Sequence, residues 1–277
     1  MEPRMSRSLG VFLAVLLCST LAQTGFAMAQ QSHSPAHVSC SDGSLQLVGS
    51  HTHGKRSACI VRPHHAMVET TYYQNASKVG GSALAAFPEM RLRYGVARHI
   101  ELFVDPPSEI AKSGLRGTGI YFMSRMGLGA KVELPPLAGI ATSFSLESHP
   151  PLEAMAYLKT FPLFDMHFDS SVSLQPNFTA NVEVGTLAFR QYGLAAHMLG
   201  YHEAFSLTRT LGSSFALTGE LGSQSRVAFG STAQTTGTLA LSRLVAKHIL
   251  ANVEIGTAFN ATGNSKPHYF GATFSIR

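Results

Sequence analysis

Charged side chains at alternating positions are the first candidates for chemistry in this sequence. In each case the neighbouring positions are mainly apolar or glycine. An extended strand has a side-chain period of two, so these charges lie on the face opposite their apolar neighbours. Interleaved acids and bases on one face could select solutes by charge, or pair with one another and fill an interior. The residues are Glu89, Arg91, Arg93, Glu101, Arg125, Lys131, Glu133, Glu183, Glu220 and Glu254.

The first thirty residues have the pattern of a cleaved export signal. A basic start with Arg4 and Arg7 precedes a short apolar run at 11–17, and Ala27-Met28-Ala29 provides a small-x-small cleavage site. The run is shorter than the ~20 residues that a membrane-spanning helix needs. Lipid attachment at Cys18 is the competing interpretation, but Leu17 is too large for the preceding position. We therefore predict a signal peptide over 1–29.

The following segment, 30–61, reads as a His-rich extension. Its cysteines, Cys40 and Cys59, are predicted to form a disulfide because an exported chain enters an oxidising compartment. In the chain-entropy model this bond stabilises the segment by about 3 kcal/mol. Imidazoles suit zinc, copper and nickel, but their spacing here matches no zinc pattern, so we predict no metal or other cofactor. The histidines in and just after this segment are His33, His37, His51, His53, His64 and His65.

From about residue 62 the chain alternates in segments of roughly ten residues, as in membrane β-barrels. For example, Met90, Leu92 and Tyr94 share one face, whereas Arg91 and Arg93 share the other. An amphipathic helix would need apolar residues three and four positions apart. Charged residues make up 13% of the chain, against about 25% in soluble domains. Lys and Arg are scattered, which excludes a nucleic-acid footprint.

The predicted links alternate in length, as do the tight turns and long outer loops of outer-membrane barrels. The sequence predicts a closed, antiparallel, transmembrane barrel of about twelve strands over 62–277, in contact with outer-membrane lipid. An even, closed set leaves no unpaired edge in lipid. Short links are predicted at 97–99, 135–137, 176–177, 209–211 and 246–248, with one more near 191–193; longer ones are predicted at 74–85, 106–117, 148–164, 222–232 and 260–267.

Over roughly 66–277 the chain resembles outer-membrane transporter-like barrels that are often linked to phenol-degradation pathways. The matching motifs are 68–70, 88–95 leading to 100–102, 126–131 before a proline turn, and the closing hairpin 250–256 with 269–272. The resemblance implies passage of small solutes, hydrophobic ones among them, and insertion by the barrel-assembly machinery. Such barrels usually end in an aromatic residue, whereas this chain ends in Ile276-Arg277.

Two other classes of function compete with a channel. A lipid hydrolase would need a nucleophile and a base within hydrogen-bond reach. His197, His202 and Glu203 are on one strand, but alternation places His197 and His202 on opposite faces, so we expect no enzyme. A structural or adhesive barrel would act through its loops. The apolar loop at 148–164 favours a channel if it folds inward and adhesion if it protrudes.

Overall fold

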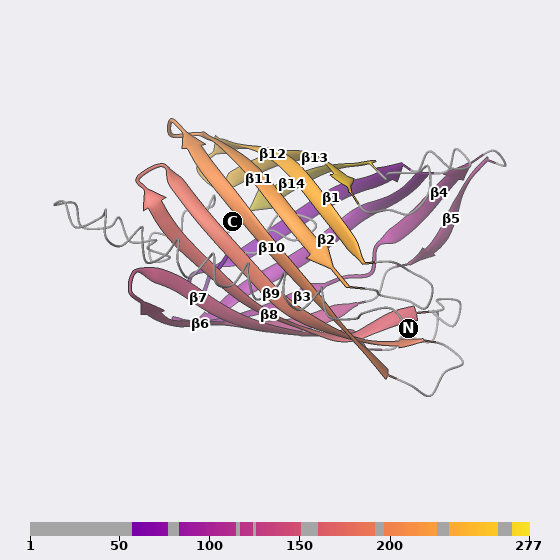
Figure 1. The fold of residues 1–277 in the computed structure, drawn as a ribbon, viewed down its shortest axis with the longest axis horizontal. Helices are drawn as coiled ribbons and strands as arrows, with labels where there is room; N and C mark the ends of the chain where they lie inside the picture. The colour runs from indigo at the N-terminus through magenta and orange to yellow at the C-terminus, as the bar shows by residue number, and fades with distance from the viewer. Residues whose placement is uncertain are drawn as a thin grey trace, which may run out of the picture. The chain divides into compact units, whose positions relative to one another are not determined.

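The described residues form one antiparallel sheet that closes into a barrel (Figure 1). The computed structural model describes residues 57–76, 83–114, 117–123, 126–150, 160–191, 197–225, 233–259 and 268–277. Closure comes from β1, which pairs with β2 on one side and with β14 on the other. The described residues contain no helix that is long and apolar enough to cross a membrane.

Fourteen strand segments make up this sheet. They are β1 (Ala66–Ala76), β2 (Ala83–Ala97), β3 (Ile100–Asp105), β4 (Glu109–Gly114), β5 (Gly117–Met123), β6 (Gly127–Leu137), β7 (Ile140–Ser148), β8 (Thr160–Gln175), β9 (Phe178–Gln191), β10 (His197–Leu211), β11 (Phe215–Gln224), β12 (Gln234–Ala246), β13 (Ile249–Ala258) and β14 (His268–Ile276).

Four of these segments combine into two barrel strands. One end of β2 pairs with β3 and the other end with β4, so β3 and β4 follow each other along the same neighbour. Pro106 and Pro107 separate them, because proline has no N–H to donate to a ladder. Segments β6 and β5 pair with β3 and β4 in the same way. The predicted closed barrel of twelve strands is therefore confirmed.

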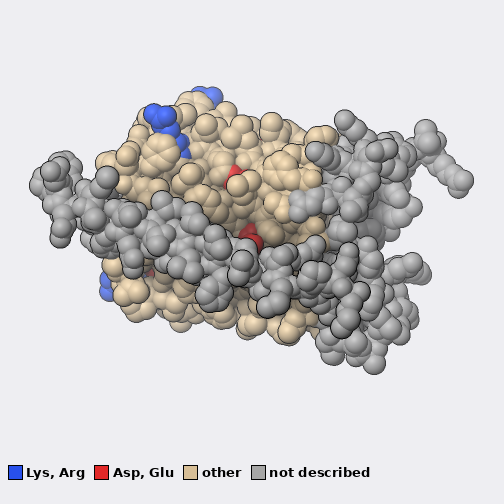
Figure 2. Space-filling view, in the orientation of Figure 1, with Lys and Arg blue, Asp and Glu red and all other residues tan. Residues whose placement is uncertain are grey.

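The outer face of the barrel is apolar and the inner face is polar. On β13, Val253 and Ile255 are about half exposed, whereas Asn252 and Glu254, which alternate with them, are buried. The wall visible in Figure 2 consists mostly of uncharged residues, with Lys and Arg toward one end. An apolar outer face costs free energy in water and is stable in lipid, which is the arrangement of transmembrane barrels.

Five short turns define one end of the barrel, here called the short-turn end. Turns at 98–99, 176–177 and 247–248 agree with the predicted links. Two predictions were wrong by a few residues. Residues 135–137 lie in β6 and the turn is Ala138–Gly139, whereas 209–211 end β10 and the turn follows at Gly212; all three turn residues have positive φ.

The predicted long link at 106–117 was also wrong, because most of it forms β4 and the start of β5. Its glycines and mixed polarity hide the alternation that marks the other strands. The central parts of the other long links, at 77–82, 151–159, 226–232 and 260–267, and the short link at 192–196, lie outside the described residues. The predicted apolar loop at 148–164 is too long, because Ser148 ends β7 and residues 160–164 begin β8; whether its central part folds inward lies outside the described residues.

Candidate functional site

Residues 57–65, here called the inner segment, enter the barrel at the short-turn end. Next to β1, the segment pairs with the end of β2: His64 N–H donates to the Gly95 carbonyl at 2.7 Å, and Gly95 N–H donates to the His65 carbonyl at 3.0 Å. Beyond Pro63 the chain turns inward, and residues 58–61 are buried. The C-terminal end of the inner segment is thus paired with the wall, and its N-terminal part lies in the interior.

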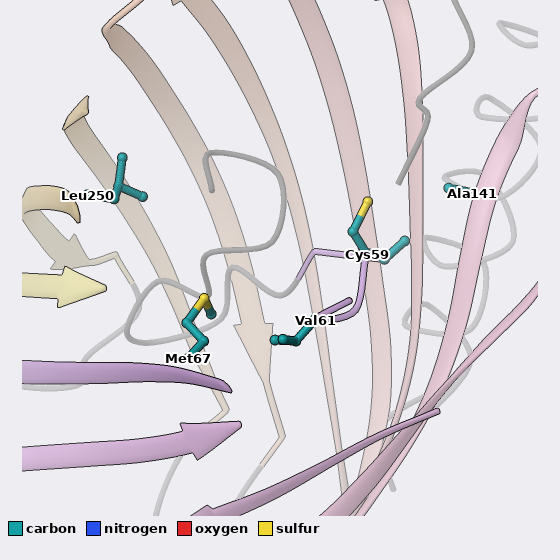
Figure 3. Close-up of a cluster of buried hydrophobic side chains, with 6 residues drawn as sticks. Cys59, Val61, Met67, Ala141 and Leu250 are labelled. Carbon is teal, nitrogen blue, oxygen red and sulfur yellow. The ribbon is translucent and has the colours of Figure 1, made fainter. Parts of the chain in front are cut away.

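A cluster of buried apolar side chains, here called the plug, lies inside the barrel at this end (Figure 3). The inner segment contributes three side chains, and strand ends of the wall contribute the others. Met67 is the second residue of β1, Ala141 the second of β7 and Leu250 the second of β13, so all three lie beside the short turns. The plug consists of Ala58, Cys59, Val61, Met67, Ala141 and Leu250, with Leu244 packed against it.

A buried ion cluster joins the inner segment to strands β1, β2 and β3. The Arg93 guanidinium lies 2.6 Å from Glu101 Oε1 and 3.5 Å from Glu69 Oε2. The Val61 N–H donates to Glu101 Oε2 at 2.7 Å. All three charged side chains are at most 5% exposed. A buried charge is stable only when it is paired and hydrogen-bonded, so this cluster fixes both the wall and Val61.

A second pair holds the far end of the inner segment. The Lys131 ammonium lies 3.0 Å from Asp169 Oδ2 and donates to the Ser57 carbonyl. The Ala58 N–H donates to Ser171 Oγ at 3.3 Å. These partners are on β6 and β8: Lys131 pairs in register with Glu101 of the Arg93 cluster, and β8 lies two strands farther around the wall. The buried part of the inner segment is therefore hydrogen-bonded to the wall at one end through Val61 and at the other through Ser57 and Ala58.

Away from the inner segment, Arg91 bridges two strands of the wall. Its guanidinium lies 2.5 Å from Asp105 Oδ2 and 3.0 Å from Glu147 Oε2. It also stacks 4.5 Å from the centre of the Phe103 ring. Arg91 is partly exposed, which distinguishes it from the fully enclosed Arg93.

A cluster of two imidazoles and two carboxylates lies on the inner faces of β8, β9 and β10. His202 Nε2 lies 2.6 Å from His167 Nδ1, and Glu183 Oε1 lies 3.0 Å from His167 Nδ1 and 3.3 Å from His202 Nε2. The second nitrogen of His167 lies 2.8 Å from Asp165 Oδ2. We call these four residues the histidine cluster.

The structure places most of the ten predicted charges inside the barrel. Three groups can be distinguished. Arg93, Glu101, Lys131, Glu183, Glu220 and Glu254 are buried; Glu89, Arg91 and Glu133 are partly buried; and Arg125 lies outside the described residues.

Sequence reasoning missed several further charged or ionisable side chains inside the barrel. Each of them follows the same alternation and could have been found from it. Glu147 comes after Leu146, and both His167 and Asp169 flank Phe168. The missed residues are Glu69, Asp105, Glu147, Asp165, His167 and Asp169.

The predicted disulfide and the predicted N-terminal segments are only partly covered by the described residues. Cys59 is buried in the plug, but Cys40 lies outside the described residues, so their pairing stays a prediction. The signal peptide and His33, His37, His51 and His53 also lie outside, whereas His64 and His65 are exposed.

Of the three residues weighed for hydrolysis, the two with described side chains lie on opposite faces of β10. His202 joins the histidine cluster, while Glu203 is exposed on the outer face, and the His197 side chain lies outside the described set. Within the described residues, neither ring of the histidine cluster is hydrogen-bonded to a serine hydroxyl.

Carboxylates outnumber cations in the interior. Among the described residues, the buried charged side chains are two cations and seven carboxylates, together with the ionisable His167. The cations are Arg93 and Lys131; the carboxylates are Glu69, Glu101, Glu147, Asp169, Glu183, Glu220 and Glu254. The inner wall therefore has an acidic bias although the whole chain has a formal net charge of +5.

Gly95 allows the inner segment to approach the wall, because an added Cβ would collide with backbone atoms of Arg62 and Val61. Replacing Gly95 with valine is expected to displace the inner segment from β2 and expose Cys59. Overpacking by about 1–2 kcal/mol shifts such an opening equilibrium roughly 5- to 30-fold. The rate of maleimide labelling of reduced Cys59 in a Cys40→Ser background of residues 30–277 measures this.

The matched control is Gly219→Ala. An added Cβ at Gly219 meets no atom within 4 Å, so this variant should label at the rate of the parent. Equal labelling of the Gly95→Val and Gly219→Ala variants would contradict the role assigned to Gly95.

Comparison with known proteins identifies the fold. No protein-family model and no curated protein sequence matches the chain. An outer-membrane channel from Pseudomonas putida F1 has a TM-score of 0.59 with 12% identity, over 78% of this chain and 97% of that one. The NanC porin has a TM-score of 0.50 with 8% identity, over 75% of this chain and 99% of that one. The chain therefore has the fold of an outer-membrane β-barrel.

Proposed function

We propose that the chain is a channel of the outer membrane for small solutes, and that its inner segment restricts passage. The observation that carries the proposal is the closed barrel with an apolar outer face and a charged, acidic inner wall. Only a closed barrel or a helix satisfies every backbone hydrogen bond in lipid. The likeness to a Pseudomonas putida channel and to a porin supports this choice.

The inner charges have two roles in this proposal. Near the short-turn end, Arg93 and Lys131 hold the inner segment through Glu101 and the Ser57 carbonyl, and so act structurally. Elsewhere around the wall, Glu183, Glu220 and Glu254 add negative charge on β9, β11 and β13. A ring of carboxylates favours cations over anions. Export by a cleaved signal peptide, insertion by the assembly machinery and a link to phenol degradation belong to the same proposal.

Single-channel conductance in planar lipid bilayers tests the proposal. Residues 30–277 are expected to conduct in small steps that favour cations. Deletion of residues 30–61 should raise the conductance several-fold, because it removes three side chains of the plug and the hydrogen bonds of Ser57, Ala58 and Val61. The Glu220→Gln, Glu254→Gln double variant should lower the cation preference, measured as the reversal potential in a KCl gradient.

Folding of each variant is checked by its heat-dependent mobility on a denaturing gel. If the full chain and the deletion variant both fold and neither conducts, the channel proposal fails. A closed structural barrel that acts through its loops would then be the better account, with the inner charges as filler.

A further inference from the structure

We propose that the histidine cluster binds a divalent transition-metal ion, such as Zn²⁺, on the inner wall of the barrel. The ligands are His167 Nδ1, His202 Nε2 and Glu183 Oε1. Asp165 would position the His167 ring from its other nitrogen. This site lies among the described residues and uses none of the histidines of the N-terminal extension, so it goes beyond the proposed channel function.

The strand register brings these side chains together. His167 on β8 and His202 on β10 both pair with Gly185 on β9, so the two rings stand on one row of the inner face. Glu183 is two positions from Gly185 and shares this face. An added Cβ at Gly185 would collide with the His202 ring. The glycine thus leaves the space in which the two imidazoles meet over the middle strand.

The distances between the three ligand atoms suit one small ion. They lie 2.6 to 3.3 Å apart. Zinc bonds of about 2.0–2.1 Å in tetrahedral geometry separate ligand atoms by about 3.3 Å. Binding would therefore increase the 2.6 Å distance between the two ring nitrogens by less than about 1 Å. Two histidines and one glutamate are also a known zinc ligand set, with a fourth position left for water or solute.

Asp165 supplies the outer partner that metal-binding histidines usually have. Its Oδ2 lies 2.8 Å from His167 Nε2, the nitrogen that faces away from the proposed ion. This approach is an ion-pair contact without hydrogen-bond geometry. A small rotation that lets His167 Nε2–H donate to Asp165 would fix the ring orientation and raise the basicity of the ligating nitrogen. One possible ligand atom each from Asp165, His167 and His202 lies within 4.8 Å of the others, so the carboxylate is close to the proposed site.

Charge and access also favour a cation. With both imidazoles counted as neutral, the two carboxylates give the cluster a formal charge of −2, the sign that attracts a divalent cation. His167 and Glu183 are nearly enclosed, whereas the Asp165 and His202 side chains are each 15% exposed. The ion could therefore enter from the interior of the barrel.

Zinc binding to the full chain, residues 30–277 in detergent and without a purification tag, tests the proposal. Because His33, His37, His51 and His53 could also bind zinc, the parent carries asparagine at these four positions. Isothermal titration is expected to show one Zn²⁺ per chain. His202→Asn and Glu183→Gln should each abolish this binding or weaken it at least about 100-fold, and Asp165→Asn about 10- to 100-fold. Co²⁺ in the same site should give the visible absorption of a tetrahedral ion.

His99→Asn is the matched control. His99 also faces a carboxylate, with Nδ1 3.9 Å from Glu133 Oε2, but its side chain is 56% exposed and no second imidazole is described beside it. Its replacement should leave zinc affinity unchanged. The proposal fails if the folded parent binds no zinc, or if folded His202→Asn and Glu183→Gln bind it as the parent does. Binding is measured in detergent, so this outcome does not depend on conductance.

Discussion

Replacing Arg93 with methionine is expected to lower the free energy of unfolding by about 3–5 kcal/mol. Arg93 is 5% exposed and its guanidinium lies between the carboxylates of Glu69 and Glu101. Removal of one partner from a buried ion pair leaves an uncompensated buried charge, which accounts for a loss of this size. Methionine preserves most of the side-chain volume. Because the chain has no tryptophan, urea unfolding in lipid vesicles is followed by circular dichroism.

Arg243→Met is the matched control. Arg243 lies at the short-turn end of β12, is exposed and stacks on the Phe215 ring at 5.2 Å. Exposed contacts of this kind contribute about 0.5–1 kcal/mol. The triple variant Glu69→Gln, Arg93→Met, Glu101→Gln should recover part of the loss, because it removes the charges that Arg93→Met leaves unpaired. A loss no greater for Arg93→Met than for Arg243→Met would contradict the structural role of the cluster.

Alternation alone predicts which residues of a strand face inward, and it succeeds where the strand is long and regular. On β13, Glu254 lies between Val253 and Ile255, and the structure buries the glutamate while it exposes both neighbours. The rule fails at β4 and β5, where glycines and mixed polarity conceal the period. It also misplaces turns next to Pro135 and Pro136, which β6 accommodates with a shift of register.

The contents of the interior could not be predicted in the same way. Residues 57–61 have no periodicity, and their partners Glu101, Lys131 and Ser171 are 40 to 113 positions away. The histidine cluster has a similar origin. His167 and His202 are 35 positions apart and meet because both pair with Gly185, a consequence of the register of three strands. Spacing along one strand offered only His197 and Glu203 as neighbours of His202, and alternation already placed His197 on the opposite face.

Replacing Val253 with arginine tests which face of the wall contacts lipid. Val253 lies near the middle of β13, is 47% exposed and stands between the buried Asn252 and Glu254. Arginine on the lipid face near the midplane of a bilayer costs about 2–4 kcal/mol, and this cost falls to about 0–1 kcal/mol near the interfaces. Urea unfolding in vesicles is therefore expected to show a loss of about 2–4 kcal/mol.

Val245→Arg is the control at a different depth on the adjacent strand. Val245 is 59% exposed, more than Val253, and lies one residue before the end of β12 at the short-turn end. If the short turns lie at the membrane surface, this variant should lose only about 0–1 kcal/mol. In water, the more exposed site and the less exposed site would both accept arginine with little change in stability. Equal small losses at the two positions would therefore contradict a lipid-facing wall, whereas a difference of about 2 kcal/mol or more would place the middle of β13 in the hydrocarbon region.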